Sequence, residues 1–282
     1  MATITFLGRD DDWENPDNWD THAPPIKDDK VIFPHFAKSS LMRHIDRGFL
    51  DLWSIWIHPG YKGDIGCEGN PLKLYLGGAA GYYGPHLLHN GSGQVHLEST
   101  WISGSVVVNA PGNKRALIIE GAEDFNRLSC LAGHVEVSAG YTGAISEVWL
   151  LESPRGGRGA QRQPDVSFID RSASGVAELM MRRGTVEYFG DIPTIKVHGG
   201  HITAHRASST AIVDQHDGEF IYNASPDILG TLYLWGGTFD TTQTSDVKAI
   251  LGLWEAPASN LLRSEHLTVT NEFTLFDSAT RR

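Results

Sequence analysis

The chain has 282 residues, of which 40% are hydrophobic, so it is long and apolar enough to bury a large core and is not a disordered protein. Its 23 lysines and arginines are outnumbered by 34 aspartates and glutamates, which gives a formal net charge of −11. This balance argues against a general nucleic-acid binder, whose affinity depends on basic groups that face phosphates. No apolar run reaches the roughly 20 residues of a membrane-spanning helix, so we expect neither nucleic acid nor a membrane as a partner.

Residues 1–36 differ from the remainder of the chain, and we expect them to form an N-terminal cap or anchor. They contain Trp13 and Trp19 among Asn-Pro and Pro-Pro pairs, which favour turns over helix. The two indoles are suited to fixing an irregular segment onto a neighbouring apolar surface. The first seven residues lack a basic segment ahead of an apolar one, so no secretory signal is predicted and a reducing cytoplasm is expected.

From about residue 50 onward, short apolar segments alternate with glycine, which occurs 31 times in the chain. Several segments alternate apolar and polar residues with a period of two, which is typical of β-strands with one buried face. Runs with the periodicity of a helix do not exceed about three turns. These patterns predict an all-β protein.

A repeat connects several of these segments through the template apolar-x-apolar-x-x-Gly-x-apolar. The template glycines are Gly133, Gly184, Gly200 and Gly237, and Gly218 matches on the second half of the template only. Spacings of 16, 18 and 19 residues separate the last four in chain order. A period below 20 in strand–Gly–strand units is typical of a β-solenoid, in which each coil stacks on the next and glycine occupies the corner.

We therefore predict a right-handed parallel β-helix (β-solenoid) over residues 37–257, with a β-sandwich as the alternative fold. A solenoid exposes unpaired strand edges at both ends, and these need to be covered. Residues 1–36 are predicted to cover one end, and residues 258–282 form a C-terminal cap or arm at the other.

Two groups of side chains suggest chemistry but are better explained as surface residues. His198, His201 and His205 resemble a metal-binding cluster, but they span a glycine pair and alternating strand positions, so no metal site is predicted. Asp214 and Asp240 are candidates for the paired acids with which β-helical enzymes cleave glycosidic bonds. Because motifs for common cofactors and nucleophiles are absent from the sequence, we predict no cofactor and no catalytic residue.

Two remaining features are a loop and the cysteines. Residues 153–164 form one low-complexity loop, and its three arginines are suited to an acidic partner surface: Arg155, Arg158 and Arg162. Cys67 and Cys130 do not form a disulfide framework or a zinc motif, and both are expected to be buried free thiols.

The opening segment carries a specific pattern, Trp13 followed by Asn18-Trp19, Pro24-Pro25 and Asp29-x-Val31-x-Phe33. It resembles the W…NW…P…D-x-V-x-F segment that leads into the first coil of β-helical bacteriophage and bacterial surface proteins. Surface proteins of bacteria normally carry a secretion signal, whereas virion proteins assemble in the host cytoplasm and need none. The resemblance, together with the predicted absence of a signal, favours a virion protein.

Among virion proteins, tailspikes are usually much longer, whereas capsid decoration (cement) proteins are short and often trimeric. The resemblance thus implies a bacteriophage capsid decoration protein that contacts the major capsid protein and itself, as a homotrimer. Trp13, Trp19 and the arginine loop are the candidate contact residues. A tailspike-like glycan-binding or glycan-cleaving protein is the alternative, and a bacterial surface adhesin is a weaker one.

Overall fold

The computed structural model describes residues 2–76, 85–122, 124–151, 165–172, 176–207, 210–223, 228–243 and 248–274. Within these ranges the chain folds into 20 strands and one three-residue 3-10 helix, η1 (Pro16–Asn18). The all-β prediction is confirmed. In the part of the chain that the structure describes, no helix has the length and apolar character needed to cross a bilayer.

The strands follow one another at short intervals along the chain. In order they are β1 (Thr3–Thr5), β2 (Lys30–Phe33), β3 (Asp46–Leu52), β4 (Ser54–Ile57), β5 (Leu72–Leu76), β6 (Pro85–His89), β7 (Val95–Asn109), β8 (Leu117–Gly121), β9 (Phe125–Val137), β10 (Ile145–Leu150), β11 (Val166–Asp170), β12 (Val176–Met181), β13 (Thr185–Tyr188), β14 (Thr194–Ala204), β15 (Ile212–Tyr222), β16 (Ile228–Leu234), β17 (Thr238–Asp240), β18 (Lys248–Glu255), β19 (Asn260–Leu262) and β20 (Leu267–Thr274).

Every pairing between these strands is parallel, and the pairings form two long stacks. Stack 1 begins at β1, β2, β4 and β6 and ends at β16, β18 and β20, and stack 2 begins at β3 and β5 and ends at β17 and β19. The long strands β7, β9, β14 and β15 run around a corner and belong to both stacks. The result is a right-handed parallel β-helix of about 10 turns, as predicted, rather than a β-sandwich.

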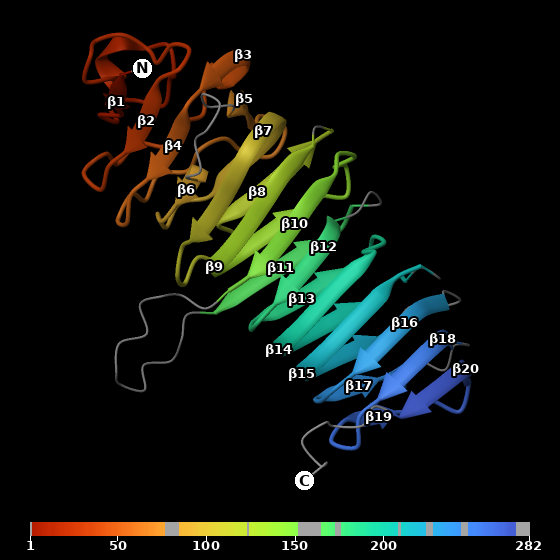
Figure 1. Ribbon diagram of the computed structural model, residues 1–282. Helices are drawn as coiled ribbons and strands as arrows, with labels where there is room; N and C mark the ends of the chain where they lie inside the picture. The colour runs from red at the N-terminus through yellow and green to blue at the C-terminus, as the bar shows by residue number, and fades with distance from the viewer. Residues whose placement is uncertain are drawn as a thin grey trace, which may run out of the picture.

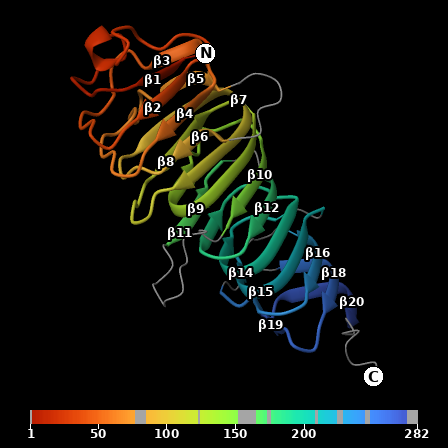
Figure 2. The same ribbon diagram turned by 60° about the vertical axis from the view of Figure 1, so that its left-hand side comes forward.

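Figure 1 shows the coils stacked along one axis, with β1 and β20 at opposite ends of the stack. The rotated view in Figure 2 shows the same single row of coils without a second body. Equivalent residues of successive coils lie in register, as in the rung Ile195–Val213–Leu232 of stack 1. Most inward-facing positions are apolar and buried, so the core is one continuous column inside the helix, interrupted by buried polar residues such as His89, Asp170 and Gln215.

The repeated glycines lie at the corner between the two stacks, as the sequence pattern predicts. All five template glycines have a positive φ, for example 94° at Gly200 and 85° at Gly218. A Cβ atom on Gly218 would lie 2.6 Å from the carbonyl oxygen of Gly200, the equivalent glycine one coil earlier. The corner therefore requires glycine for two reasons, the left-handed backbone and the close approach of the neighbouring coil.

The N-terminal segment closes its end of the solenoid, although its first two strands, β1 and β2, are also the first rungs of stack 1. Trp13 and Trp19 are both 0% exposed, and their rings lie 5.0 Å apart. Trp19 also packs against Phe6 at 5.4 Å, and its Nε1 donates to the carbonyl oxygen of Trp13 at 2.8 Å. The prediction that these indoles fix the segment onto an apolar surface is confirmed.

Asn18 organises the backbone around this aromatic group. Its Oδ1 accepts from the backbone N–H groups of Arg9 and Asp10 at 2.7 and 2.9 Å. Its Nδ2 donates to Asp10 Oδ1 at 2.5 Å and to the carbonyl oxygen of Asp12 at 2.7 Å. The buried amide thus pairs with backbone groups of an irregular loop, which also forms a parallel bridge to the next coil through Asp12 and Arg43.

The C-terminal end is built differently. The predicted boundary at residue 258 falls just before β19, which pairs with β17, and β20 pairs with β18, so both strands continue the solenoid. β20 is the last described rung of stack 1, and most of its residues are exposed. Only Leu267 and Val269 pack partly against the core.

Candidate functional site

The sequence-predicted contact residues are not on the surface where the structure describes them. Trp13 and Trp19 are fully buried in the N-terminal cap, so their proposed role as partner-contact residues is wrong for the folded chain. The physical reason is that Asn18 closes the loop over them. Arg155, Arg158 and Arg162 lie outside the described residues.

The three histidines take separate partners. Nδ1 of His201 lies 2.8 Å from Glu219, and Nε2 of His205 lies 2.9 Å from Glu187. His198 instead stacks on His216, with ring centroids 4.8 Å apart. Among the residues that the structure describes, no group of three or more His, Cys, Asp or Glu side chains is placed to hold a metal ion.

Asp214 and Asp240 lie on different stacks, so the structure does not bring them together as a cleaving pair. Asp214 occupies stack 1 in β15, where its Oδ1 accepts from Trp235 Nε1 at 2.9 Å. Asp240 occupies stack 2 in β17 and is 3% exposed. Burial raises the pKa of Asp240, but hydrogen bonds from Gln243 and Thr242 and the charge of Lys248 lower it by more. A carboxyl group held ionised in this way is not suited to act as a general acid.

The cysteine prediction is half right. Cys130 is buried in the core, and burial raises the pKa of its thiol to about 12. Cys67 is exposed, because it lies in a tight turn where it pairs with Asn70 rather than on an inward-facing strand position.

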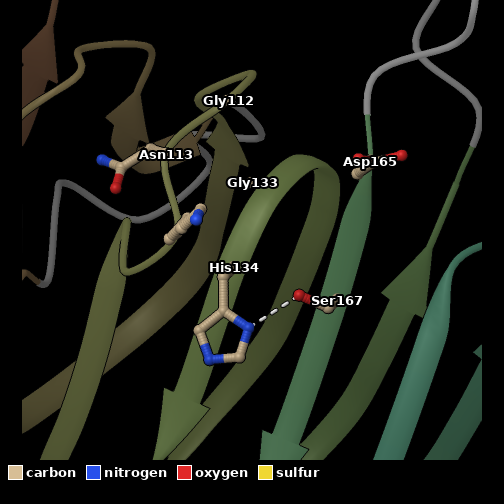
Figure 3. A pocket seen from close by; sticks show the side chains of 7 residues that line it. Gly112, Asn113, Gly133, His134, Asp165 and Ser167 are labelled. Carbon is tan, nitrogen blue, oxygen red and sulfur yellow. Dashed lines mark hydrogen bonds between the residues drawn. The ribbon is translucent and has the colours of Figure 1, made fainter.

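A cavity of about 320 Å³ lies at the corner beside β9 and β11 (Figure 3). His134 Nδ1 lies 2.6 Å from Ser167 Oγ, and the two residues are neighbours in one rung of stack 2. Burial lowers the pKa of His134, which favours its neutral imidazole. Figure 3 shows the Asp165 side chain away from the His134 ring, so the three groups do not form the hydrogen-bonded series of a catalytic triad.

The main unusual surface is an outward-facing column on stack 1. We call its last members, together with the neighbouring Trp235, the aromatic strip, which consists of Tyr233, Trp235, Trp254 and Phe273. Tyr233 and Trp254 stack at 5.0 Å and Trp254 and Phe273 at 4.9 Å, with interplanar angles of 28° and 19°. Trp235 is 41% exposed and Phe273 is 49% exposed.

The ring planes of the strip determine what it presents to solvent. The centroid distances match the spacing of neighbouring strands, so the rings stack on one another along the solenoid axis. Trp254 leans over Gly252, where a Cβ atom would lie 2.7 Å from the indole ring. The ring faces are therefore used in stacking, and mainly ring edges face outward.

The same column is covered differently in the earlier coils. Trp56 lies under the ammonium group of Lys30, which is 2.9 Å from the ring centroid. Trp149 lies under the guanidinium group of Arg127 at 4.0 Å. Within the ranges described, no cation lies over Tyr233, Trp254 or Phe273 in this way.

Sequence reasoning missed the strip as a unit, although a signal for it was present. Tyr233, Trp254 and Phe273 are separated by 21 and 19 residues, close to the length of one coil. An aromatic residue that recurs once per coil predicts a ladder, provided that the register of each coil is known. The loops between the later coils differ in length, and this hid the register.

No family model, no curated protein and no solved structure matches the chain.

Proposed function

We propose that this chain is a non-catalytic structural protein of a virion, a bacteriophage capsid decoration protein that stabilises the shell through subunit-bridging contacts. The opening W…NW…P…D-x-V-x-F segment supports the virion assignment by resemblance. The observation that carries the structural role is the aromatic strip on the outside of the solenoid, in which Trp235 and Phe273 are exposed and Tyr233 and Trp254 are half-buried. Its partners are the major capsid protein and further copies of the chain, in a particle assembled in the host cytoplasm.

The geometry of the strip favours a protein partner over a glycan. Sugars bind aromatic side chains mainly by lying flat on the ring face, and here Tyr233 and Trp254 use their faces to stack on neighbouring rings. Ring edges in a row form an apolar ridge, which is a common core of protein–protein interfaces. The separation of Asp214 and Asp240 onto two stacks also weighs against glycan cleavage.

The mechanism of stabilisation is mechanical. Within the described residues, parallel strand pairing joins successive coils along stack 1 from β1 to β20 and along stack 2 from β3 to β19, which favours a stiff body. A stiff rod that contacts several shell subunits adds interface area, and the subunits then separate only if that added contact is also broken. The overall charge of −11 keeps the remaining surface from associating non-specifically.

The test is the copy number of this chain in particles purified from a producing culture, measured against the major shell protein by quantitative mass spectrometry. Copies on the order of the number of shell subunits support the decoration role. The second readout is the temperature at which particles release DNA, which we expect to fall when the gene is deleted and to recover on adding purified protein.

Other copy numbers contradict the proposal and indicate the alternatives. A handful of copies per particle places the chain in the tail, where release of reducing ends from host polysaccharide tests for cleavage. Asp214→Asn and Asp240→Asn would then be compared with the unmodified chain. Absence from particles, with the protein found on the cell surface, indicates an adhesin.

A further inference from the structure

Three histidines are buried, and all three lie in β6 or at the start of β7. His86 is 2% exposed, His89 is 0% exposed and His96 is 6% exposed, whereas the other histidines of the chain are exposed or half-buried. His89 faces the core, in the rung Ile57–His89–Val108 of stack 1. A titratable ring in an otherwise apolar column couples proton uptake to the structure around it.

The corner that follows β6 holds the imidazole ring of His89. Its Nε2–H group donates to the carbonyl oxygen of Gly93 at 3.1 Å. A Cβ atom on Gly91 would lie 2.8 Å from Ile57 Cγ2 and 3.5 Å from His89 Cε1. A Cβ atom on Gly93 would lie 1.9 Å from the carbonyl oxygen of Gly63. The corner is therefore packed closely around the ring.

This bonding leaves no acceptor for a second proton on the ring. Nε2 carries the proton of the neutral imidazole, and among the described residues Nδ1 has no hydrogen-bond partner. Burial lowers the pKa of His89 from its ordinary 6.5 to about 4, and hydrogen bonds to the backbone of Gly93 and Ala116 oppose this only in part. A protonated ring would place both a charge and an unpaired donor inside the core.

Neighbouring charges do not offset this cost. The titratable side chains on the elements packed around His89 are His58, Tyr61, Lys62 and Asp64 after β4, His86 on β6, His96 and Glu98 on β7, Lys114 and Arg115 before β8, and Cys130 on β9. Asp64 accepts from the backbone N–H of Gln94 at 2.7 Å. The carboxylate of Glu98 lies 2.9 Å from the ammonium group of Lys73. The lowered pKa of His89 has burial as its cause and no contribution from these charges.

The same corner is bonded to the loop beside the cavity of Figure 3. Asn113 Nδ2 donates to the carbonyl oxygens of Gly93 and Ser92 at 2.8 and 3.1 Å. The carbonyl oxygen of Asn113 accepts from the backbone N–H of His134 at 3.1 Å, and both residues line the cavity. The Gly93 carbonyl thus accepts from the core histidine on one side and from the cavity loop on the other.

We propose that His89 is an acid-sensitive latch, and that a proton on its ring opens the corner at residues 90–93 and releases the Asn113 loop beside the cavity. This inference goes beyond the proposed function and does not depend on it.

Acid is expected to weaken the corner over a defined range. The unfolded or opened chain takes up a proton on His89 near pH 6.5, whereas the closed chain takes it up only near pH 4. The stability that the neutral ring contributes is therefore complete above pH 6.5 and is lost as pH falls towards 4. One group with these two values raises the equilibrium constant for opening about 30-fold between about pH 7.5 and about pH 5.

The experiment measures amide hydrogen exchange of the purified full-length chain at about pH 7.5 and about pH 5, with the intrinsic exchange rate corrected for pH. The amides of Asn90 and Ser92, which donate to carbonyl oxygens of the preceding coil, are expected to lose protection tenfold or more. The amide of His134 should follow, because its acceptor is Asn113. Amides of β14, far along the solenoid, should change much less.

Two variants separate His89 from the other titrating groups. His89→Gln keeps a side-chain N–H donor but takes up no proton, so it should abolish the loss of protection at Asn90 and Ser92. His58→Gln is the matched control, because His58 is an exposed histidine of the preceding coil. A loss that persists in His58→Gln and disappears in His89→Gln supports the proposal. The same loss in both variants overturns it, and so does full protection of the unmodified chain at pH 5.

The unmodified chain decides the question if His89→Gln does not fold. An NMR titration then follows the His89 ring while exchange is measured on the same sample. A ring that takes up its proton near pH 6.5 with no loss of protection at residues 90–93 overturns the proposal. A ring that stays neutral at pH 6.5, and whose protonation at lower pH accompanies the loss of protection, supports it.

Discussion

The two ends of this solenoid use aromatic residues in opposite ways. At the N-terminal end, Trp13 and Trp19 are 0% exposed and lie under an irregular loop. At the C-terminal end, Trp254 and Phe273 stack on the outside of stack 1, and Phe273 is 49% exposed. The difference teaches that an aromatic residue near a solenoid end does not by itself indicate a cap or an interface.

What distinguishes the two ends is the polar group beside the rings. Asn18 forms four hydrogen bonds with Arg9, Asp10 and Asp12, and these close the loop over the indoles. At the other end, Asn271 donates from the surface to the carbonyl oxygen of Leu251 at 3.1 Å and closes no loop. A buried amide that satisfies a loop therefore makes a cap, and without it the rings remain available to a partner.

If the two ends differ in this way, the largest expected effect is a loss of unfolding free energy when the N-terminal cap is mutated. Trp19→Ala removes a fully buried indole and its hydrogen bond to Trp13, and is expected to lower the free energy of unfolding by about 3–5 kcal/mol. Trp235→Ala, at an exposed indole, is expected to cost less than about 1 kcal/mol. Urea unfolding followed by circular dichroism measures both values. Equal losses in the two variants would show that the two ends do not differ.

The corner glycines offer the next test, because they lie in the coils between the two ends. Gly69→Ala is the reference, since Gly69 has a φ of 77° and open space around its Cβ position. It is expected to cost about 1–2 kcal/mol from backbone strain alone. Gly218→Ala adds a contact with the carbonyl oxygen of Gly200, so we expect it to cost about 1–3 kcal/mol more. Similar losses of unfolding free energy in the two variants would contradict the close packing at the corner.

A smaller effect is expected from pH at the cap. A hydrogen bond from the Asp12 backbone, together with those from Asn15 and Asn18, holds the pKa of Asp10 below its ordinary value. A carboxyl with a lowered folded pKa stabilises the folded state above its ordinary pKa and loses that contribution as pH falls. The stability lost in Asp10→Asn should therefore shrink between about pH 6 and about pH 3.

Asp17→Asn is the control for this measurement, because it removes the same charge from the same segment at a side chain that is 79% exposed. Its effect on the free energy of unfolding should vary much less over the same pH range. If Asp10→Asn and Asp17→Asn show the same pH dependence, the network around Asn18 does not hold Asp10 in its ionised form.

The β-helix could be predicted from the sequence because each repeated glycine marks a local backbone conformation. Gly184, Gly200, Gly218 and Gly237 each need a left-handed corner, and their spacing is the coil length, so the β-helix followed from residues close together in sequence. The burial of Trp13 and Trp19 as a cap also followed from the turn-forming residues around them. Their exposure as contact residues, inferred from resemblance, was wrong.

The aromatic strip was harder to predict for a physical reason. Whether Tyr233 and Trp254 stack depends on the register of two coils, and that register is set by loops of unequal length. The separation of Asp214 from Asp240 has another origin, because Asp214 lies on stack 1 and Asp240 lies on stack 2. The sequence shows which side chains each coil contains. Which side chains of neighbouring coils touch one another depends on the register of those coils.

The finest effect expected is a gradient of amide hydrogen exchange along the molecule. At a concentration where the chain is monomeric, amides of β18 and β20 should exchange faster than those of β2 and β4, because the cap protects the N-terminal rungs and β20 is a terminal strand. Trp19→Ala should speed exchange in β2 and leave exchange in β20 unchanged. A uniform exchange rate along stack 1 would mean that the ends are equally protected, and the contrast between a closed and an open end would have to be abandoned.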